Sequence, residues 1–100
     1  MRLSVLEMRY GSPLEDVNPE NDNFDVSIHL TDGRVFAFLL ATPNNIYSRM
    51  TNEGTDYFFS HPPPLLVSRM DTPHIEAVFS VLLSQENPER WLNAYGVLQD

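Results

Sequence analysis

The residues best suited to chemistry lie in the segment Asp71-Thr-Pro-His-Ile-Glu76, which places a histidine between two acids. His74 could act as a general base with Asp71 orienting its ring, and a helix starting here would offer N–H groups to an anion. The same residue types also favour the first turn of a helix without catalysis, because negative charge there interacts favourably with the helix dipole. Since no nucleophile motif lies nearby, we interpret the segment as a helix start. A small enzyme or ligand site near Asp71 and His74 is the alternative.

Other patterns that could bind a metal or a cofactor fall short in this sequence. The absence of cysteine excludes a disulfide, a thiolate metal site and a cysteine nucleophile. The histidines at positions 29, 61 and 74 lack the close spacing of metal-ligand pairs. The four glycines are scattered and form no phosphate-binding loop, and Asp22 and Asp25 lack the alternating ligands of a calcium loop. We therefore predict no cofactor and no metal, and we expect a binding protein rather than an enzyme.

Charge is distributed unevenly along the chain. The net charge is −8, and six acids but no base lie between Arg9 and Arg34. Nucleic acids and anionic membranes bind through Lys and Arg, so neither is expected as a partner. An acidic surface either keeps a protein soluble or attracts a basic protein. The second hypothesis assigns partner binding to the acids in the first half of the chain, Glu15, Asp16, Glu20, Asp22 and Asp25.

The size of the chain suits one domain. One hundred residues are enough for one ordinary core, so we predict a single domain over residues 1–100. The hydrophobic fraction of 42% is that of a globular protein. The apolar stretch at the start is too short for a signal peptide, and no run approaches the roughly 18 apolar residues of a membrane span. These features predict a cytoplasmic protein.

The strands are indicated by alternating apolar residues. Residues 2–10 predict a strand, residues 11–23 a surface loop, and residues 24–40 a hairpin around Asp32-Gly33. A three-residue turn with Gly33 in the left-handed region would place Phe36 and Phe38 beside Ile28 and Val26. A two-residue turn would place them on the polar face instead. We predict the three-residue turn, because a one-residue slip exchanges the faces and this register builds the larger core.

Three helix starts share one pattern, a capping residue followed by proline, at Thr42, Thr72 and Asn87. The predicted helices cover about 43–52, 73–84 and 88–95, with Gly96 placed to cap the third. The stretch SHPPPLLV separates the first two, and its prolines predict a stiff lead-in to a strand over 65–70 rather than a recognition motif. The prediction is an α+β fold. It has a small mixed four-stranded sheet, the order strand–strand–strand–helix–strand–helix–helix, and a single layer of helices.

Two groups of apolar residues could lie either inside or on the surface. Tyr57, Phe58 and Phe59 could form a binding patch, but we expect them in the core because a small domain needs its large side chains. The strand over 35–40 is apolar on both faces and should be central. If no helix covers its second face, formed by Val35, Ala37 and Leu39, that face should pair two chains into a homodimer.

The stretch DVSIHLTDGRVFAFLLATPNNI, followed by LLVSRM and TPHIEAVFSVLL, is similar to small bacterial domains of unassigned function. It also resembles the compact acidic immunity proteins that neutralise secreted toxins. The resemblance implies a non-catalytic, inhibitor-like domain that acts by binding another protein, and it assigns no role to individual residues. It leads us to predict a protein partner, and the acidic composition favours a basic one.

Overall fold

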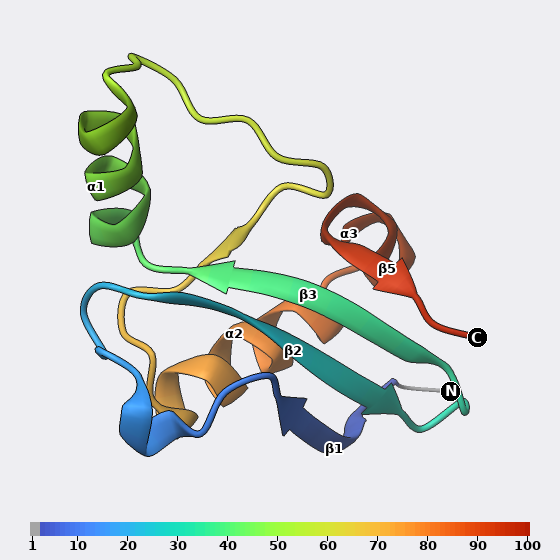
Figure 1. Ribbon diagram of the computed structural model, residues 1–100. Coiled ribbons are helices and arrows are strands. Elements are labelled where there is room, and N and C mark those ends of the chain that lie inside the picture. Colours follow the sequence, from blue (N-terminus) through green and yellow to red (C-terminus); the bar gives the residue numbers. More distant parts are fainter. Residues whose placement is uncertain (1–2) are drawn as a thin grey trace.

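The computed structural model describes residues 3–100 and confirms an α+β fold (Figure 1). The sheet has five strands in the order β1-β2-β3-β4, and β5 also pairs with β3. The sheet is mixed, because β4 runs parallel to β3 whereas the other pairs are antiparallel. The elements are β1 (Val5–Tyr10), the short 3-10 helix η1 (Leu14–Asp16), β2 (Asn23–Leu30), β3 (Val35–Ala41), α1 (Pro43–Glu53), β4 (Leu65–Leu66), α2 (Thr72–Leu83), α3 (Pro88–Tyr95) and β5 (Gly96–Leu98).

The hairpin of β2 and β3 has the predicted register. Val26 lies opposite Phe38 and Ile28 opposite Phe36. The N–H of Leu30 donates to the carbonyl of Arg34 at 2.9 Å, which leaves three residues in the turn. Gly33 has φ of 92°, the left-handed conformation that glycine adopts without steric cost. The predicted turn is therefore confirmed, and it directs the large side chains of both strands to one face.

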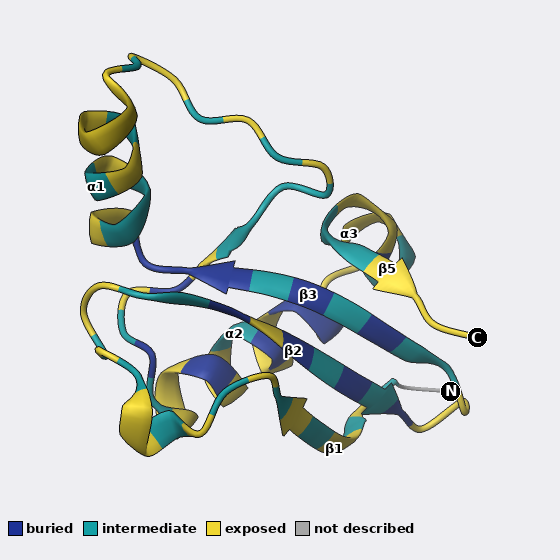
Figure 2. Cartoon of the chain, in the orientation of Figure 1, coloured by how far each residue is buried: buried dark blue, intermediate teal, exposed yellow. Residues whose placement is uncertain are grey.

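That face of the sheet packs against α2 to form the core. The apolar stripe of α2 is fully buried at Ile75 and Phe79, and the Phe79 ring meets the Phe38 ring edge to face at 5.0 Å. Figure 2 shows the alternation along β2 and β3 between buried residues and residues of intermediate burial. The intermediate residues of β3, Val35, Ala37 and Leu39, lie on the second face of this central strand.

The edges of the sheet differ from the prediction. The first strand begins at Val5 rather than at residue 2, and Arg2 lies outside the described residues. The predicted strand over 65–70 is only two residues long, because after Val67 the chain turns back. The N–H of Met70 then donates to the carbonyl of Pro19 at 2.7 Å. Loop contacts at this point replace the sheet ladder.

The C-terminal end of the chain adds a strand that was not predicted. Gly96 caps α3 as predicted, with its N–H donating to the Leu92 carbonyl, but its φ of −105° and ψ of 160° are extended rather than left-handed, and it begins β5. Glycine is required here by close packing. A Cβ at this position would lie 2.7 Å from the Leu92 carbonyl oxygen and 2.8 Å from Cζ of Phe38. Glycine is therefore needed at position 96 because Leu92 and Phe38 lie too close for a Cβ, and not because the backbone is left-handed.

The predicted helix starts are present, with one change. Thr42 caps α1 by accepting the Asn45 N–H at 3.3 Å. The cap of α2 is Asp71 rather than Thr72, and Asn87 precedes α3 without a side-chain cap bond. Side-chain amides also hold α1 to the start of β2, with Asn23 donating to Asn45 at 2.8 Å. The helix α1 is fixed at its first turn in this way, although none of its described residues is fully buried.

Candidate functional site

The most exposed large apolar residue of the described chain, Phe59, lies in the loop of residues 54–64, which we call the aromatic loop. Gly54, with φ of 70°, ends α1 in the left-handed conformation and turns the chain outward. The three prolines at 62–64 then lead stiffly into β4. Local bonds hold the bends, since the Thr55 hydroxyl donates to the Tyr57 carbonyl at 3.0 Å and the Ser60 hydroxyl to the Pro62 carbonyl at 2.9 Å. Figure 1 shows this loop arching away from the sheet between α1 and β4.

The aromatic side chains of this loop do not join the core. The Phe59 side chain is 88% exposed and Tyr57 is 63% exposed, and their rings meet edge to face at 5.9 Å. Phe58 is half-buried, with the Arg49 guanidinium 5.0 Å from its ring centroid. The expectation that these residues pack in the core is therefore wrong for Tyr57 and Phe59. These two residues lie on the long loop that arches away from the sheet between α1 and β4, so they do not reach the core (Figure 1).

Two acidic residues lie close to the aromatic pair in the sequence. Glu53 at the end of α1 and Asp56 in the loop are exposed, and Arg49 is the nearby base stacked on Phe58. Large rigid aromatic side chains are the typical anchors of protein–protein interfaces, because they bury much area at a low entropic cost. The exposed pair Tyr57 and Phe59 therefore consists of residue types that typically serve as such anchors.

Asp71 and His74 are brought together, and their contacts are those of a helix cap. One carboxylate oxygen of Asp71 accepts the His74 N–H at 3.0 Å and lies 2.6 Å from its Nδ1. The other oxygen lies 3.0 Å from Nε of Arg69. The pKa of the Asp71 carboxyl is lowered mainly by the hydrogen bond from the His74 main-chain N–H. The bond to the His74 side chain and the charge of Arg69 lower it further. Both side chains lie outside the groove described below, whose lining includes the neighbouring Thr72 but neither of them.

The predicted acidic residues differ in their contacts. Glu15 and Asp16 are exposed together in η1, and Asp25 is exposed on β2. Glu20 forms an ion pair with Arg69 at 3.2 Å. The Asp22 carboxylate accepts main-chain N–H groups of Asn18 and Asn23, at 3.1 and 2.8 Å. Asp22 thus shapes the loop, whereas Glu15, Asp16 and Asp25 present their charges to solvent.

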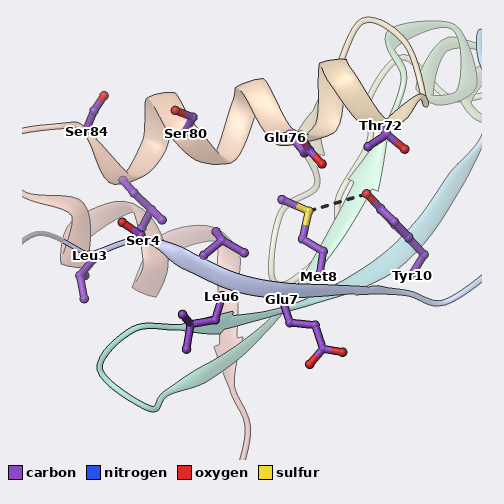
Figure 3. Close-up of a pocket in the computed structure, with 12 residues that line it drawn as sticks. Leu3, Ser4, Leu6, Glu7, Met8, Tyr10, Thr72, Glu76, Ser80 and Ser84 are labelled. Atoms are coloured by element: carbon purple, nitrogen blue, oxygen red, sulfur yellow. Dashed lines mark hydrogen bonds between the residues drawn. The ribbon is translucent and has the colours of Figure 1, made fainter.

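A groove of about 700 Å³, which the sequence did not indicate, runs between β1 and α2 (Figure 3). On the α2 side it is lined by polar residues at four-residue spacing, Thr72, Glu76, Ser80 and Ser84, and by the apolar Leu83. Met8 and Tyr10 project into it from β1, with the Tyr10 hydroxyl 3.8 Å from the Met8 sulfur. Burial, assisted by the charge of Glu76, raises the pKa of Tyr10. The four-residue polar spacing along 72–84 was visible in the sequence, but not that β1 would lie beside it.

Comparisons with known proteins give no relative. The chain matches no protein-family profile, no curated protein and no solved structure. Within the described part of the chain, no helix is both long and apolar enough to cross a membrane. Among residues 3–100, no three histidine or carboxylate side chains are grouped to hold a metal ion.

Proposed function

We propose that this chain is a non-catalytic protein-binding domain whose anchors are Tyr57 and Phe59. The observation that carries the proposal is the 88% exposure of the Phe59 side chain. A small domain that leaves a phenylalanine in water forgoes hydrophobic stabilisation of about 2 kcal/mol. An apolar pocket on a partner recovers that free energy when it covers the ring, together with the adjoining Tyr57.

The charge of the domain supports a basic partner. The net charge is −8, and Glu53 and Asp56 beside the aromatic pair are exposed. Glu15, Asp16 and Asp25 add exposed negative charge elsewhere on the surface, with Glu20 and Asp22 partly neutralised by their own contacts. Such a field accelerates association with a positively charged protein and is screened by salt beyond a Debye length of about 8 Å. An inhibitor-like domain that covers a basic protein fits this combination.

A cytoplasmic location fits the composition. The chain has no cysteine, and disulfides are the usual support of small domains in oxidising compartments. The alternative function, an enzyme or ligand site near Asp71 and His74, has less support. The carboxylate is committed to the start of α2 and to Arg69. The pair also lies outside the groove.

The test is capture of a partner from a lysate of the source cell, followed by binding measurements with purified components. Phe59→Ser and Tyr57→Ser should each weaken binding by about thirtyfold or more, as expected for interface anchors. Val81→Ser is the matched control, since Val81 is an apolar residue on α2 that is 60% exposed. A partner that binds all three variants equally would contradict the proposal. A small metabolite retained in native mass spectrometry and lost in His74→Ala would support the alternative.

A further inference from the structure

The strand β1 is an edge of the sheet with unpaired main-chain groups. It pairs with β2 on one side, where Glu7 lies opposite His29 and Arg9 opposite Ser27. The N–H of Gly11 donates to the carbonyl of Asp25 at 2.7 Å. Residues of an antiparallel strand alternate in the direction of their N–H and C=O groups, so Glu7, Arg9 and Gly11 face β2. The main-chain groups of Met8 and Tyr10 therefore face away from β2, and among residues 3–100 they have no hydrogen-bond partner.

The side chains of this edge are complementary to themselves. Glu7 and Arg9 flank Met8, share the sheet face opposite α2, and form an exposed ion pair at 3.2 Å. In an antiparallel pair of identical strands centred on Met8, Glu7 of each copy lies directly opposite Arg9 of the other. Opposite charges at directly facing positions stabilise a strand pair. The central pair of Met8 residues would also exchange two main-chain hydrogen bonds, because their N–H and C=O groups already face outward.

We propose that the partner of this edge is a second copy of the same chain, bound through antiparallel pairing of the two β1 strands about Met8. The pairing is isologous, so one two-fold axis satisfies both edges and the assembly closes as a dimer. The two sheets become continuous across the paired β1 strands.

The groove between β1 and α2 explains why a second strand fits at this place. It opens about 700 Å³ beside the edge, so α2 leaves room for an added chain. Edge strands are often protected by charges and bulges, and β1 has both, with the bulge between Val5 and Glu7. Here the bulge lies before Glu7, outside the Glu7–Arg9 segment that would pair with its counterpart in the second copy.

The dimer does not depend on the aromatic loop. Figure 1 shows β1 at one edge of the sheet and the loop of residues 54–64 beyond the opposite edge. Dimerisation would therefore leave both copies of Tyr57 and Phe59 accessible. A failure of either proposal leaves the other intact, because their test residues are different.

The test is a charge exchange followed by sedimentation of the full chain over a range of concentrations. Glu7→Arg and Arg9→Glu each place like charges opposite one another and should weaken the dimer by about tenfold or more. An equimolar mixture of the two variants should form a heterodimer, because every facing pair is then of opposite charge. The double variant E7R/R9E should dimerise like the original chain, and added salt should reduce these differences.

Glu86→Arg and Arg90→Glu are matched controls, since both residues are exposed and lie outside β1. They should leave the dissociation constant unchanged. Exchange of the Met8 amide proton should slow as the protein concentration rises, whereas exchange at Glu7, already bonded to β2, should change less. A chain that stays monomeric at all concentrations would overturn the proposal, as would a dimer in which both single variants persist and the Met8 amide is unprotected.

Discussion

The core under α2 and the aromatic loop contain similar residues that lie in opposite environments. Phe36, Phe38 and Phe79 are at most 1% exposed, whereas Phe59 is 88% exposed. The first group lies on elements whose periodicity directs every large side chain to one face. The loop has no such periodicity, and its prolines prevent it from crossing the sheet. The difference indicates that core packing involves the first group, whereas Phe59 takes no part in it.

The largest expected effect is in the core. Phe79→Ala should lower the free energy of unfolding by about 3–5 kcal/mol through lost transfer energy and a cavity against Phe38. Chemical denaturation followed by circular dichroism measures this change. Glu76→Ala, on the exposed side of the same helix, is the control and should stay within about 0.5 kcal/mol. Equal losses in the two variants would mean that α2 packs with a different face.

The next effect concerns the turn that aligns the two central strands. Gly33→Val should cost about 2 kcal/mol, because a β-branched residue resists the φ of 92°. A Cβ at this position would meet no described atom within 4 Å, so the cost is conformational rather than a clash. Gly33→Asn should cost clearly less, since asparagine tolerates the left-handed region. Thermal melts of the two variants compare them, and equal melting temperatures would contradict the assigned turn.

Much of the fold could be predicted because it follows local rules. The register of β2 and β3 followed from two alternating patterns around Asp32-Gly33, and the helix starts followed from capping residues before proline. The strand β5 was missed because its three residues have too short a pattern and pair with β3, distant in sequence. Such pairing depends on the whole chain and leaves no local signal.

The surfaces were harder to predict than the fold. The exposure of Tyr57 and Phe59 depends on the path of the loop, and composition alone favoured burial. Likewise, the acidic residues look equivalent in the sequence, but Asp22 binds main-chain N–H groups and Glu20 meets Arg69. The free edge of β1 required knowledge of strand order. Sites that join distant segments are therefore visible only in the folded chain.

A smaller effect should come from the ion network that joins the hairpin turn to α3. Arg34 bonds Glu89 through both terminal nitrogens, one at 2.8 Å from Oε2, and its Nε lies 2.7 Å from Asp32. These contacts lower the pKa values of both carboxyls, for Glu89 mainly through the Arg34 side-chain bond and for Asp32 mainly through the Arg34 main-chain N–H. Arg34→Gln should lower the melting temperature by about 5 °C at pH 7.

The loss of melting temperature in Arg34→Gln should depend on pH in a definite direction. A carboxyl with a lowered folded-state pKa stabilises the protein above its unfolded pKa, and this stabilisation disappears as the pH falls through the folded value. The melting temperatures of Arg34→Gln and the original chain should therefore converge as the pH falls below about 4. Arg90→Gln is the control, because Arg90 stacks on Trp91 and lies outside the described ion pairs. A difference that stays constant down to pH 2 would exclude the network as its source.

The smallest effect on stability is expected in the aromatic loop, where the effect on binding should be largest. Phe59→Ser should change the free energy of unfolding by less than about 0.5 kcal/mol, because an 88% exposed ring loses little packing on removal. Phe58→Ser, one position earlier, should cost more, since Phe58 is half-buried under Arg49. Denaturation curves of the two variants compare the half-buried Phe58 with the exposed Phe59 in the same loop. If Phe59→Ser destabilised the domain as much as Phe58→Ser, Phe59 would be a structural residue. Phe59 would then contribute to stability as the core phenylalanines do, and the loop would not differ from the core in this respect.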